Sequence, residues 1–185
     1  MNDSTTAVLT LDIQDGLLDL APEARIVVPA AERVLRCARE HSMLIIHVGL
    51  GFEPGYPEIP TASPIWGKLR DLRLFEKGSP SARFVGSLRD PADTVIYKQR
   101  VSAFTDTPLD LILRSQDITT VVLMGISTSH VVFSTLRSAI EKDYACVIIQ
   151  DGCFDTEPAL HDILIDKVFA REATVVTAAE FTNST

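Results

Sequence analysis

The sequence predicts an α/β fold, a three-layer doubly wound (Rossmann-like) sheet of about six mainly parallel strands, in a single domain over residues 1–185. Apolar runs of strand length alternate with segments of helical periodicity along the whole chain. The runs are nearly continuous in Val, Ile and Leu, which is typical of parallel strands covered by helices on both faces. A length of 185 residues suffices for one sizeable core.

The strands and helices are expected in regular alternation. Strands are predicted where an apolar run is bounded by polar or turn residues, at 6–12, 43–50, 93–98, 118–126, 145–151 and 173–178. Helices are predicted at 28–40, 108–115, 128–142 and 158–169. The first of these helices carries a stripe of apolar residues at helical spacing, namely Val28, Ala31, Val34, Leu35 and Ala38.

Residues 51–90 interrupt this alternation with a segment rich in Pro, Gly and aromatic residues. A loop this long inside a compact domain is usually functional. Its bulky side chains could wall a pocket, and a packed surface excursion with a short helix explains each of them equally well: Phe52, Tyr56, Pro57, Trp66 and Phe84.

Composition narrows the class of partner. The formal net charge is -8 and no Lys/Arg run stands out, which argues against nucleic acid or an anionic membrane as the main partner and leaves a small-molecule substrate open. No apolar run approaches the ~20 residues of a membrane span, and the first residues lack a basic signal-peptide region, so we expect a cytoplasmic protein. The three cysteines, Cys37, Cys146 and Cys153, form no CxxC pair and predict neither disulfides nor zinc.

Polar side chains close several of the predicted strands, where open parallel sheets bind their ligands. Asp12 ends the first strand and Lys98 the third. A charge there is costly unless it is paired, so the two could form a carboxylate–ammonium couple suited to acid–base catalysis, or a structural salt bridge. His47, near the end of the second strand, is most simply a strand residue hydrogen-bonded to its neighbours, with a direct role as the alternative.

The turn at 125–129 joins the fourth strand to a helix and is rich in hydroxyl groups. Backbone N–H groups at a helix N-terminus could bind an oxyanion or a carboxylate. Ser127, Thr128 or Ser129 could instead act as the helix N-cap. His130 is expected to face solvent or an interface. Since no His/Asp/Glu cluster has ligand spacing, no metal is expected.

Three motifs, "LTLDIQ", "YKQRVSAFTDT" and "GISTSHVVFSTLRSA", resemble the isochorismatase-like superfamily, often called cysteine hydrolases, and "QDGCFD" and "VVTAAEF" extend the match over nearly the whole chain. The resemblance implies a doubly wound fold, hydrolase activity and a homo-oligomer, either a dimer or a tetramer. Hydrolases of the family use an Asp-Lys-Cys triad, and Asp12 and Lys98 match its first two members. The resemblance also implies a cis peptide bond between Ile126 and Ser127, and it places Phe104 near the ligand.

The chain departs from the family pattern at the nucleophile, because Val131 stands where the triad cysteine belongs. Gln14 likewise stands where nicotinamidases have their first zinc-binding histidine. Isochorismatases proper also lack the cysteine, and use the aspartate as an acid and water as the nucleophile. We therefore expect Asp12 and Lys98 to be catalytic, with no cofactor or metal, and a substrate-binding set of Gln14, His47, Phe104, Ile126, Ser127, Thr128 and Val131.

Three functions stay open at this point. The leading hypothesis is a cofactor-independent hydrolase or lyase acting on a small molecule, an anion or a carbonyl compound. The second is a non-catalytic binding or scaffold protein, and the third uses another nucleophile, Ser134 or Cys153. The nearby ammonium of Lys98 lowers the pKa of Asp12 and favours a base, whereas burial raises that pKa and favours an acid.

Overall fold

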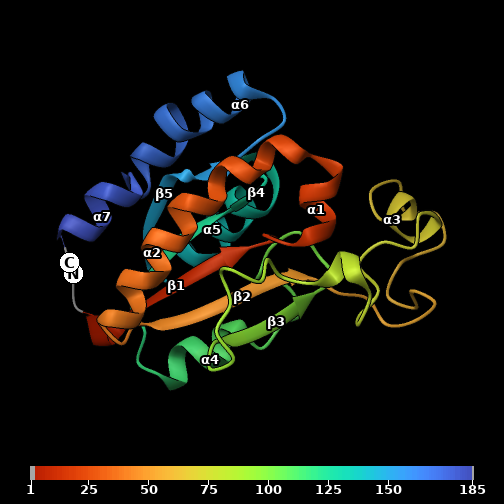
Figure 1. Ribbon diagram of the computed structural model, residues 1–185, viewed down its shortest axis with the longest axis horizontal. Coiled ribbons are helices and arrows are strands. Elements are labelled where there is room, and N and C mark those ends of the chain that lie inside the picture. The colour runs from red at the N-terminus through yellow and green to blue at the C-terminus, as the bar shows by residue number, and fades with distance from the viewer. Residues whose placement is uncertain (1–2, 185) are drawn as a thin grey trace.

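The computed structural model describes residues 3–184, and its centre is one sheet of six strands in the order β3-β2-β1-β4-β5-β6 (Figure 1). Every pair of neighbouring strands is parallel, which confirms the predicted α/β class. The strands are β1 (Thr6–Leu11), β2 (Leu44–Leu50), β3 (Thr94–Lys98), β4 (Thr120–Ile126), β5 (Ala145–Phe154) and β6 (Thr174–Val176).

Helices cover both faces of this sheet. From β1 the chain passes to β2 on one side, and from β4 it passes to β5 on the other, so right-handed crossovers place the two connecting helices, α2 and α5, on opposite faces. Helix α7 packs against α2 (Figure 1). The α-helices are α1 (Asp15–Leu20), α2 (Val28–Glu40), α3 (Gly67–Asp71), α4 (Leu109–Ser115), α5 (Phe133–Ile140), α6 (Pro158–Ile163) and α7 (Ala178–Ser184).

Short 3-10 and π-helical turns complete the fold. The 3-10 turns are η1 (Asp3–Thr5), η2 (Pro22–Val27), η3 (Pro80–Ala82) and η6 (Phe169–Arg171), and the π-helical turns are η4 (Thr128–Val132) and η5 (Leu164–Val168). The predicted helix at 128–142 therefore begins as the π-helical turn η4, and the one at 158–169 breaks into α6, η5 and η6. Among the described residues, no helix is both long and apolar enough to cross a membrane.

The order in which the strands are connected reverses between β1 and β4, and the candidate site lies at this position. All six residues of β1 are buried, as are six of the seven in β4, so both strands lie in the core, as their apolar sequences predict. The connections leave the two strands in opposite directions, which opens a crevice at their carboxyl ends. Asp12 and the turn after Ile126 lie at those two ends.

Strand β5 is longer than the sequence indicates, since it runs to Phe154 rather than ending near Asp151. Its pairing with β4 is irregular between Leu123 and Gly125, so the chain stays in the sheet past the polar residues that suggest a strand end. Cys153 consequently lies inside a strand and is buried.

Residues 51–90 form an ordered excursion that carries α3, on the right of Figure 1. The excursion has a small core of its own, in which buried side chains from β2 and the excursion pack together: Leu50, Phe52, Tyr56, Ile59 and Phe75. Phe84 instead packs against His47 and Tyr97, with ring centroids 5.9 and 5.7 Å apart. The segment is therefore a packed surface excursion, as one interpretation of the sequence has it. It also contributes to a pocket wall, as the other has it, because Trp66 lines a cavity described below.

Gly125 offers a test of how tightly β4 packs beside β1. A Cβ at this position would lie 2.7 Å from the Cβ of Leu11 and collide with the Leu11 backbone, so Gly125→Ala should lower the free energy of unfolding by about 1–3 kcal/mol. Gly86→Ala is the matched control, since nothing lies within 4 Å of its Cβ, and it should change stability by less than about 0.5 kcal/mol. Equal effects of the two variants in urea unfolding would contradict the close approach.

Candidate active site

Asp12 and Lys98 meet at the carboxyl edge of the sheet, although β2 lies between their strands. Asp12 follows β1 directly, with φ 58°, a left-handed conformation that Asp tolerates better than most residues. Its N–H donates to the carbonyl of Val48, 2.8 Å away, which holds the backbone against β2. Lys98 is the last residue of β3 and reaches past the end of β2.

The two side chains form a buried ion pair. Lys98 Nζ donates to Asp12 Oδ2 at 2.9 Å and to the carbonyl of Arg100 at 3.1 Å. Asp12 is 5% exposed and Lys98 1%. Asp12 Oδ1 is shielded from solvent and makes no hydrogen bond of normal geometry within residues 3–184, although the N–H of Leu50, which donates to Gln14 Oε1, lies near enough to favour the charged form of Asp12.

Burial and the ammonium act on Asp12 in opposite directions. Burial raises the pKa of Asp12 above its ordinary value, and the charge and hydrogen bond of Lys98 oppose that rise without cancelling it. A carboxyl group with a raised pKa binds a proton more readily than a free one, and can exchange it with a bound molecule.

The turn after β4 contains a cis peptide bond between Ile126 and Ser127, as the resemblance implies. Ser127 is the N-cap residue of η4, one of the three expected, but its side chain makes no capping hydrogen bond. Instead Asp155 accepts the N–H of Ser129 at 2.8 Å, and Thr128 Oγ1 lies 2.8 Å from His161 Nδ1. The N–H of Ser129 is thus committed to a carboxylate from outside the turn and is not free to bind an oxyanion.

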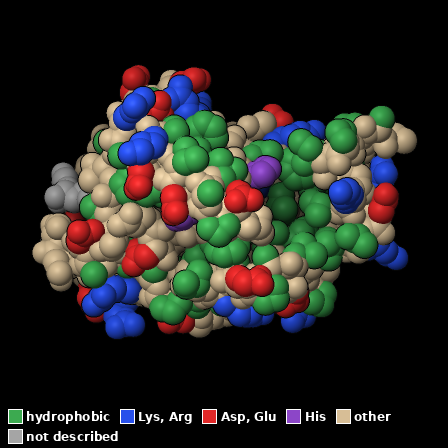
Figure 2. All heavy atoms as spheres, turned by 90° about the horizontal axis from the view of Figure 1, so that it is seen from above, with side chains coloured by type: hydrophobic (Ala, Val, Ile, Leu, Met, Phe, Trp, Pro, Cys, Tyr) green, Lys and Arg blue, Asp and Glu red, His purple; other side chains and the backbone are tan. Residues whose placement is uncertain are grey.

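A cavity of about 330 Å³ opens beside the ion pair. Figure 2 shows hydrophobic side chains gathered around a hollow towards the end of the molecule that carries α3. Besides Asp12 and Lys98, the cavity is lined by Leu17, Leu20, Ala21, Leu50, Ile65, Trp66, Val101, Ile126, Ser127, His130, Val131 and Thr156.

Five of the nine predicted site residues therefore line one cavity: Asp12, Lys98, Ile126, Ser127 and Val131. The other four, Gln14, His47, Phe104 and Thr128, are not among its lining residues. The side chain of Gln14 donates to the carbonyls of Leu50 and Ala82, at 2.8 and 2.9 Å, and joins β2 to the excursion.

His47 lies within a buried polar chain. Its Nδ1 is 2.7 Å from Thr10 Oγ1 and its Nε2 is 3.0 Å from Asp93 Oδ2, so both ring nitrogens are engaged. Burial lowers the pKa of His47, although Asp93 partly opposes this, and the neutral ring is favoured. These contacts match the simpler sequence interpretation of a strand residue bonded to its neighbours.

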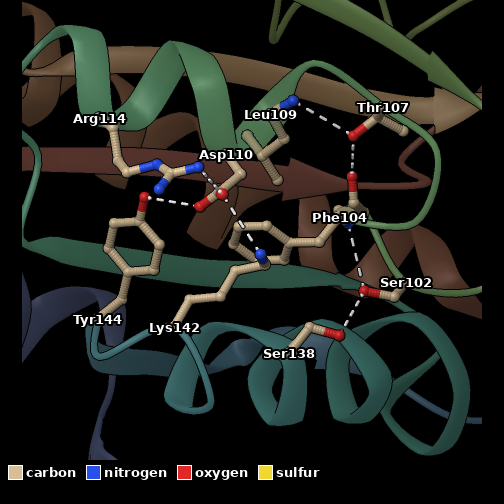
Figure 3. A network of polar contacts seen from close by, with 10 residues as sticks. Ser102, Phe104, Thr107, Leu109, Asp110, Arg114, Ser138, Lys142 and Tyr144 are labelled. Carbon is tan, nitrogen blue, oxygen red and sulfur yellow. Dashed lines mark hydrogen bonds and ion pairs between the residues drawn. The ribbon is translucent and has the colours of Figure 1, made fainter.

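Phe104 does not line the cavity, and its side chain lies near Tyr144 and Lys142 (Figure 3). Its ring stacks on Tyr144 with centroids 5.9 Å apart, and Lys142 Nζ lies 5.9 Å from the ring centre. Ser102 Oγ, two residues earlier, lies 2.9 Å from Ser138 Oγ on α5. The motif that suggests a ligand contact thus fastens the loop after β3 to α5.

Sequence reasoning missed several cavity residues. His130 is exposed, as predicted, but it also lines the cavity, with Nδ1 3.2 Å from Ser127 Oγ and 3.0 Å from Ser129 Oγ. Leu17 and Leu20 belong to α1, a helix of six residues, which is too short to show a helical period. In the sequence, the only indication of these two residues is that they are leucines close after Asp12.

The alternative nucleophiles lie elsewhere. Cys153 does not line this cavity but a second one of about 510 Å³, and burial raises its pKa to about 12. Burial raises the pKa of Cys146 to about 11. Ser134 is also absent from the lining, and its carbonyl accepts a hydrogen bond from Ser138. Within residues 3–184, no group of three or more His, Cys, Asp or Glu side chains could hold a metal ion.

Comparison with known proteins identifies the family. Residues 6–180 match the family model described as "Isochorismatase domain". Ureidoacrylate amidohydrolase RutB from Methylorubrum extorquens is 32% identical over 177 residues, which cover 83% of this chain and 71% of the relative. The chain belongs to the isochorismatase family and, by this family and its relatives, is an isochorismatase-family hydrolase.

Solved structures agree with the fold. N-carbamoylsarcosine amidase from Thermoplasma acidophilum is 28% identical, with a TM-score of 0.79 over 94% of this chain and 96% of that one. A cysteine hydrolase from Pseudomonas syringae pv. phaseolicola superposes with a TM-score of 0.89 over 99% of this chain and 93% of that one, at 18% identity. At that identity the second likeness concerns the fold alone.

Val131 allows a test of the cavity chemistry. A thiol placed there by Val131→Cys would line the same cavity as the Lys98 ammonium, near a helix N-terminus, and both features favour a thiolate. We expect iodoacetamide to label this variant at pH ~7.5 at least about tenfold faster than the wild-type protein, because Cys37, Cys146 and Cys153 do not line this cavity. The rates of labelling are measured by mass spectrometry. Equal rates for the variant and the wild-type protein would show that the cavity does not admit the reagent or does not activate a thiol.

His47 predicts a specific dependence of stability on pH. Its pKa in the folded protein lies below its ordinary value of 6.5, so the unfolded chain binds more protons as the pH falls below 6.5, and folding loses stability there. This one group should make the unfolding free energy of the wild-type protein fall by up to about 1.4 kcal/mol per pH unit below pH ~6.5. His47→Asn removes this contribution, so its unfolding free energy should fall less between pH ~7.5 and ~5.5. Urea unfolding at these two pH values measures both unfolding free energies. If they fall equally with pH in the variant and in the wild-type protein, the ring of His47 is not held in its neutral form.

Proposed function

We propose that this protein hydrolyses a small molecule with the Asp12–Lys98 pair and water, without a cysteine nucleophile. The observation that carries the proposal is the buried ion pair, with its 2.9 Å contact, at a cavity of about 330 Å³. One oxygen of Asp12 is held by Lys98 and the other makes no hydrogen bond of normal geometry within residues 3–184.

The two residues have different roles in this proposal. Asp12 is the proton-transfer group, because its pKa is raised and it lines the cavity. Lys98 fixes the orientation of the carboxyl group, since it is anchored by the carbonyl of Arg100 as well. Val131 presents an apolar side chain where the family has its thiol, so water is the nucleophile. Hydrolysis then needs one proton taken from water and one given to the leaving group, and Asp12 can do both in turn.

The names of the relatives suggest where to look for the bond that is broken. The amidohydrolase and the amidase among them are named for ureidoacrylate and N-carbamoylsarcosine. An amide-type C–N bond is therefore the first candidate for this chain, and it would be cleaved here without a thioester intermediate.

A non-catalytic binding protein is the second candidate, and Val131 is the observation that favours it. A cavity filled by side chains, or an Asp12 and Lys98 that stay apart, would have supported that alternative. The cavity is open and the two side chains are in contact, so the hydrolase is the better supported proposal.

Asp12→Asn tests the proposal. It keeps the shape of the side chain and removes the proton-transfer group, so turnover should fall by at least about 10²-fold. The assay measures ammonia release from a panel of ureido, carbamoyl and primary amide compounds. Asp166→Asn, at an exposed carboxylate that does not line the cavity, is the control and should retain full activity.

Two outcomes would reject the proposal. Turnover by Asp12→Asn at the wild-type rate would exclude Asp12 as the proton-transfer group. Absence of turnover of any compound by the wild-type protein, with binding of some of them, would favour the non-catalytic alternative.

A further inference from the structure

We infer that the cavity beside Asp12 and Lys98 takes an uncharged molecule with an apolar body and a hydrogen-bond donor directed at the Asp12 carboxyl group, and that it discriminates against carboxylates. The inference rests on the proposed function only in that it concerns the same site. It narrows the sequence expectation, which left both an anion and a carbonyl compound open.

The walls of the cavity are apolar and come from several separate segments. Helix α1 and the residue after it contribute Leu17, Leu20 and Ala21, and the excursion contributes Ile65 and Trp66. Leu20 is 55% exposed and Ile65 62%, so the apolar surface continues from the interior to the entrance. A ligand that covers these side chains gains stability from the apolar area that it removes from water.

The cavity offers no free positive charge. Of the described residues that line it, Asp12 and Lys98 alone carry a formal charge at neutral pH with histidine neutral, and they are paired with each other. Arg100 follows close behind Lys98, but it does not line the cavity, and its guanidinium donates to the carbonyl of Gln99 at 2.8 Å. A bound carboxylate would have to compete with Asp12 for Lys98, or lose its water without a counter-charge, and both are costly.

The Asp12 carboxyl group specifies the polar part of the ligand. Asp12 lines the cavity and its Oδ2 accepts a hydrogen bond from Lys98 Nζ, so a molecule that donates a further hydrogen bond to this carboxyl group adds a charge-assisted contact. An amide or urea N–H, or a hydroxyl, fits this requirement. A carboxylate has no hydrogen to donate and would face Asp12 with like charge.

The size of the cavity limits the ligand to a small molecule. At ~30 Å³ per water molecule, 330 Å³ corresponds to roughly ten water molecules. Cyclohexanecarboxamide is a suitable probe, because it combines a compact apolar ring with an N–H donor. Cyclohexanecarboxylate has the same shape with a negative charge, and N,N-dimethylcyclohexanecarboxamide is neutral but has no donor.

The test compares the dissociation constants of these three probes for the wild-type protein at pH ~8, by isothermal titration calorimetry or ligand-observed NMR. The carboxamide should bind at least about tenfold more tightly than the carboxylate, and several-fold more tightly than the dimethyl compound. Equal or tighter binding of the carboxylate would overturn the inference. So would failure of the carboxamide to bind at concentrations where the carboxylate binds, or failure of all three to bind.

Two exposed leucines provide a matched pair of variants. Leu20→Arg places a cation at the cavity wall and should shift the preference towards the carboxylate by at least about tenfold. Leu72→Arg adds the same charge at a residue that is 65% exposed and does not line the cavity, and it should leave the preference unchanged. If both variants shift the preference equally, the effect is one of net charge and the cavity is not the binding site.

His130→Gln addresses the remaining titratable side chain of the lining. The preference for the carboxamide should persist in this variant. If the wild-type protein binds the carboxylate and His130→Gln does not, the imidazole supplies the missing charge and the inference is wrong. These measurements need no turnover. Selective binding of the carboxamide without hydrolysis of any compound would therefore refute the proposed function alone, and hydrolysis with a carboxylate preference would refute the inference alone.

Discussion

The buried contact between Lys98 and Asp12 is the constraint on which the rest of the site depends. It joins the ends of β1 and β3 across β2, so it forms only if all three strands keep their parallel register. Removing one partner from such a pair leaves the other charge buried and unpaired, which typically costs about 3–5 kcal/mol. The contact lies at the edge of the sheet together with the Arg100 carbonyl, which accepts a second hydrogen bond from Lys98, and with the cavity that both side chains line.

The sequence predicts the sheet closely, because burial on both faces requires long apolar runs that stand out from their surroundings. It predicts the site less evenly. Asp12, Gln14 and His47 give the same signal, a polar residue at or near a strand end, yet only Asp12 lines the cavity. The direction of a side chain depends on partners from distant segments, such as Ala82 for Gln14 and Asp93 for His47. The motif that contains Phe104 is likewise visible in the sequence, but its packing on Tyr144 is not.

Val131 is part of the cavity that Asp12 and Lys98 also line. Val131 is buried at 2% exposure and adds to the apolar wall, while the ion pair and the cis peptide bond before Ser127 remain in place. Burial raises the pKa of Cys153 to about 12, and this residue lines a different cavity. The polar groups at the cavity are the carboxyl group of Asp12, the ammonium group of Lys98 and the side chains of Ser127, His130 and Thr156.

The excursion and α1 supply much of the cavity wall, whereas strand ends supply the charged pair. Gln14 connects the two parts through hydrogen bonds to Leu50 and Ala82, so the wall is attached to the sheet without being part of it. Loops tolerate substitution, insertion and deletion better than buried strands do. Within this architecture, substitutions in the wall can change which ligand fits without disturbing the strand ends that hold Asp12 and Lys98 together.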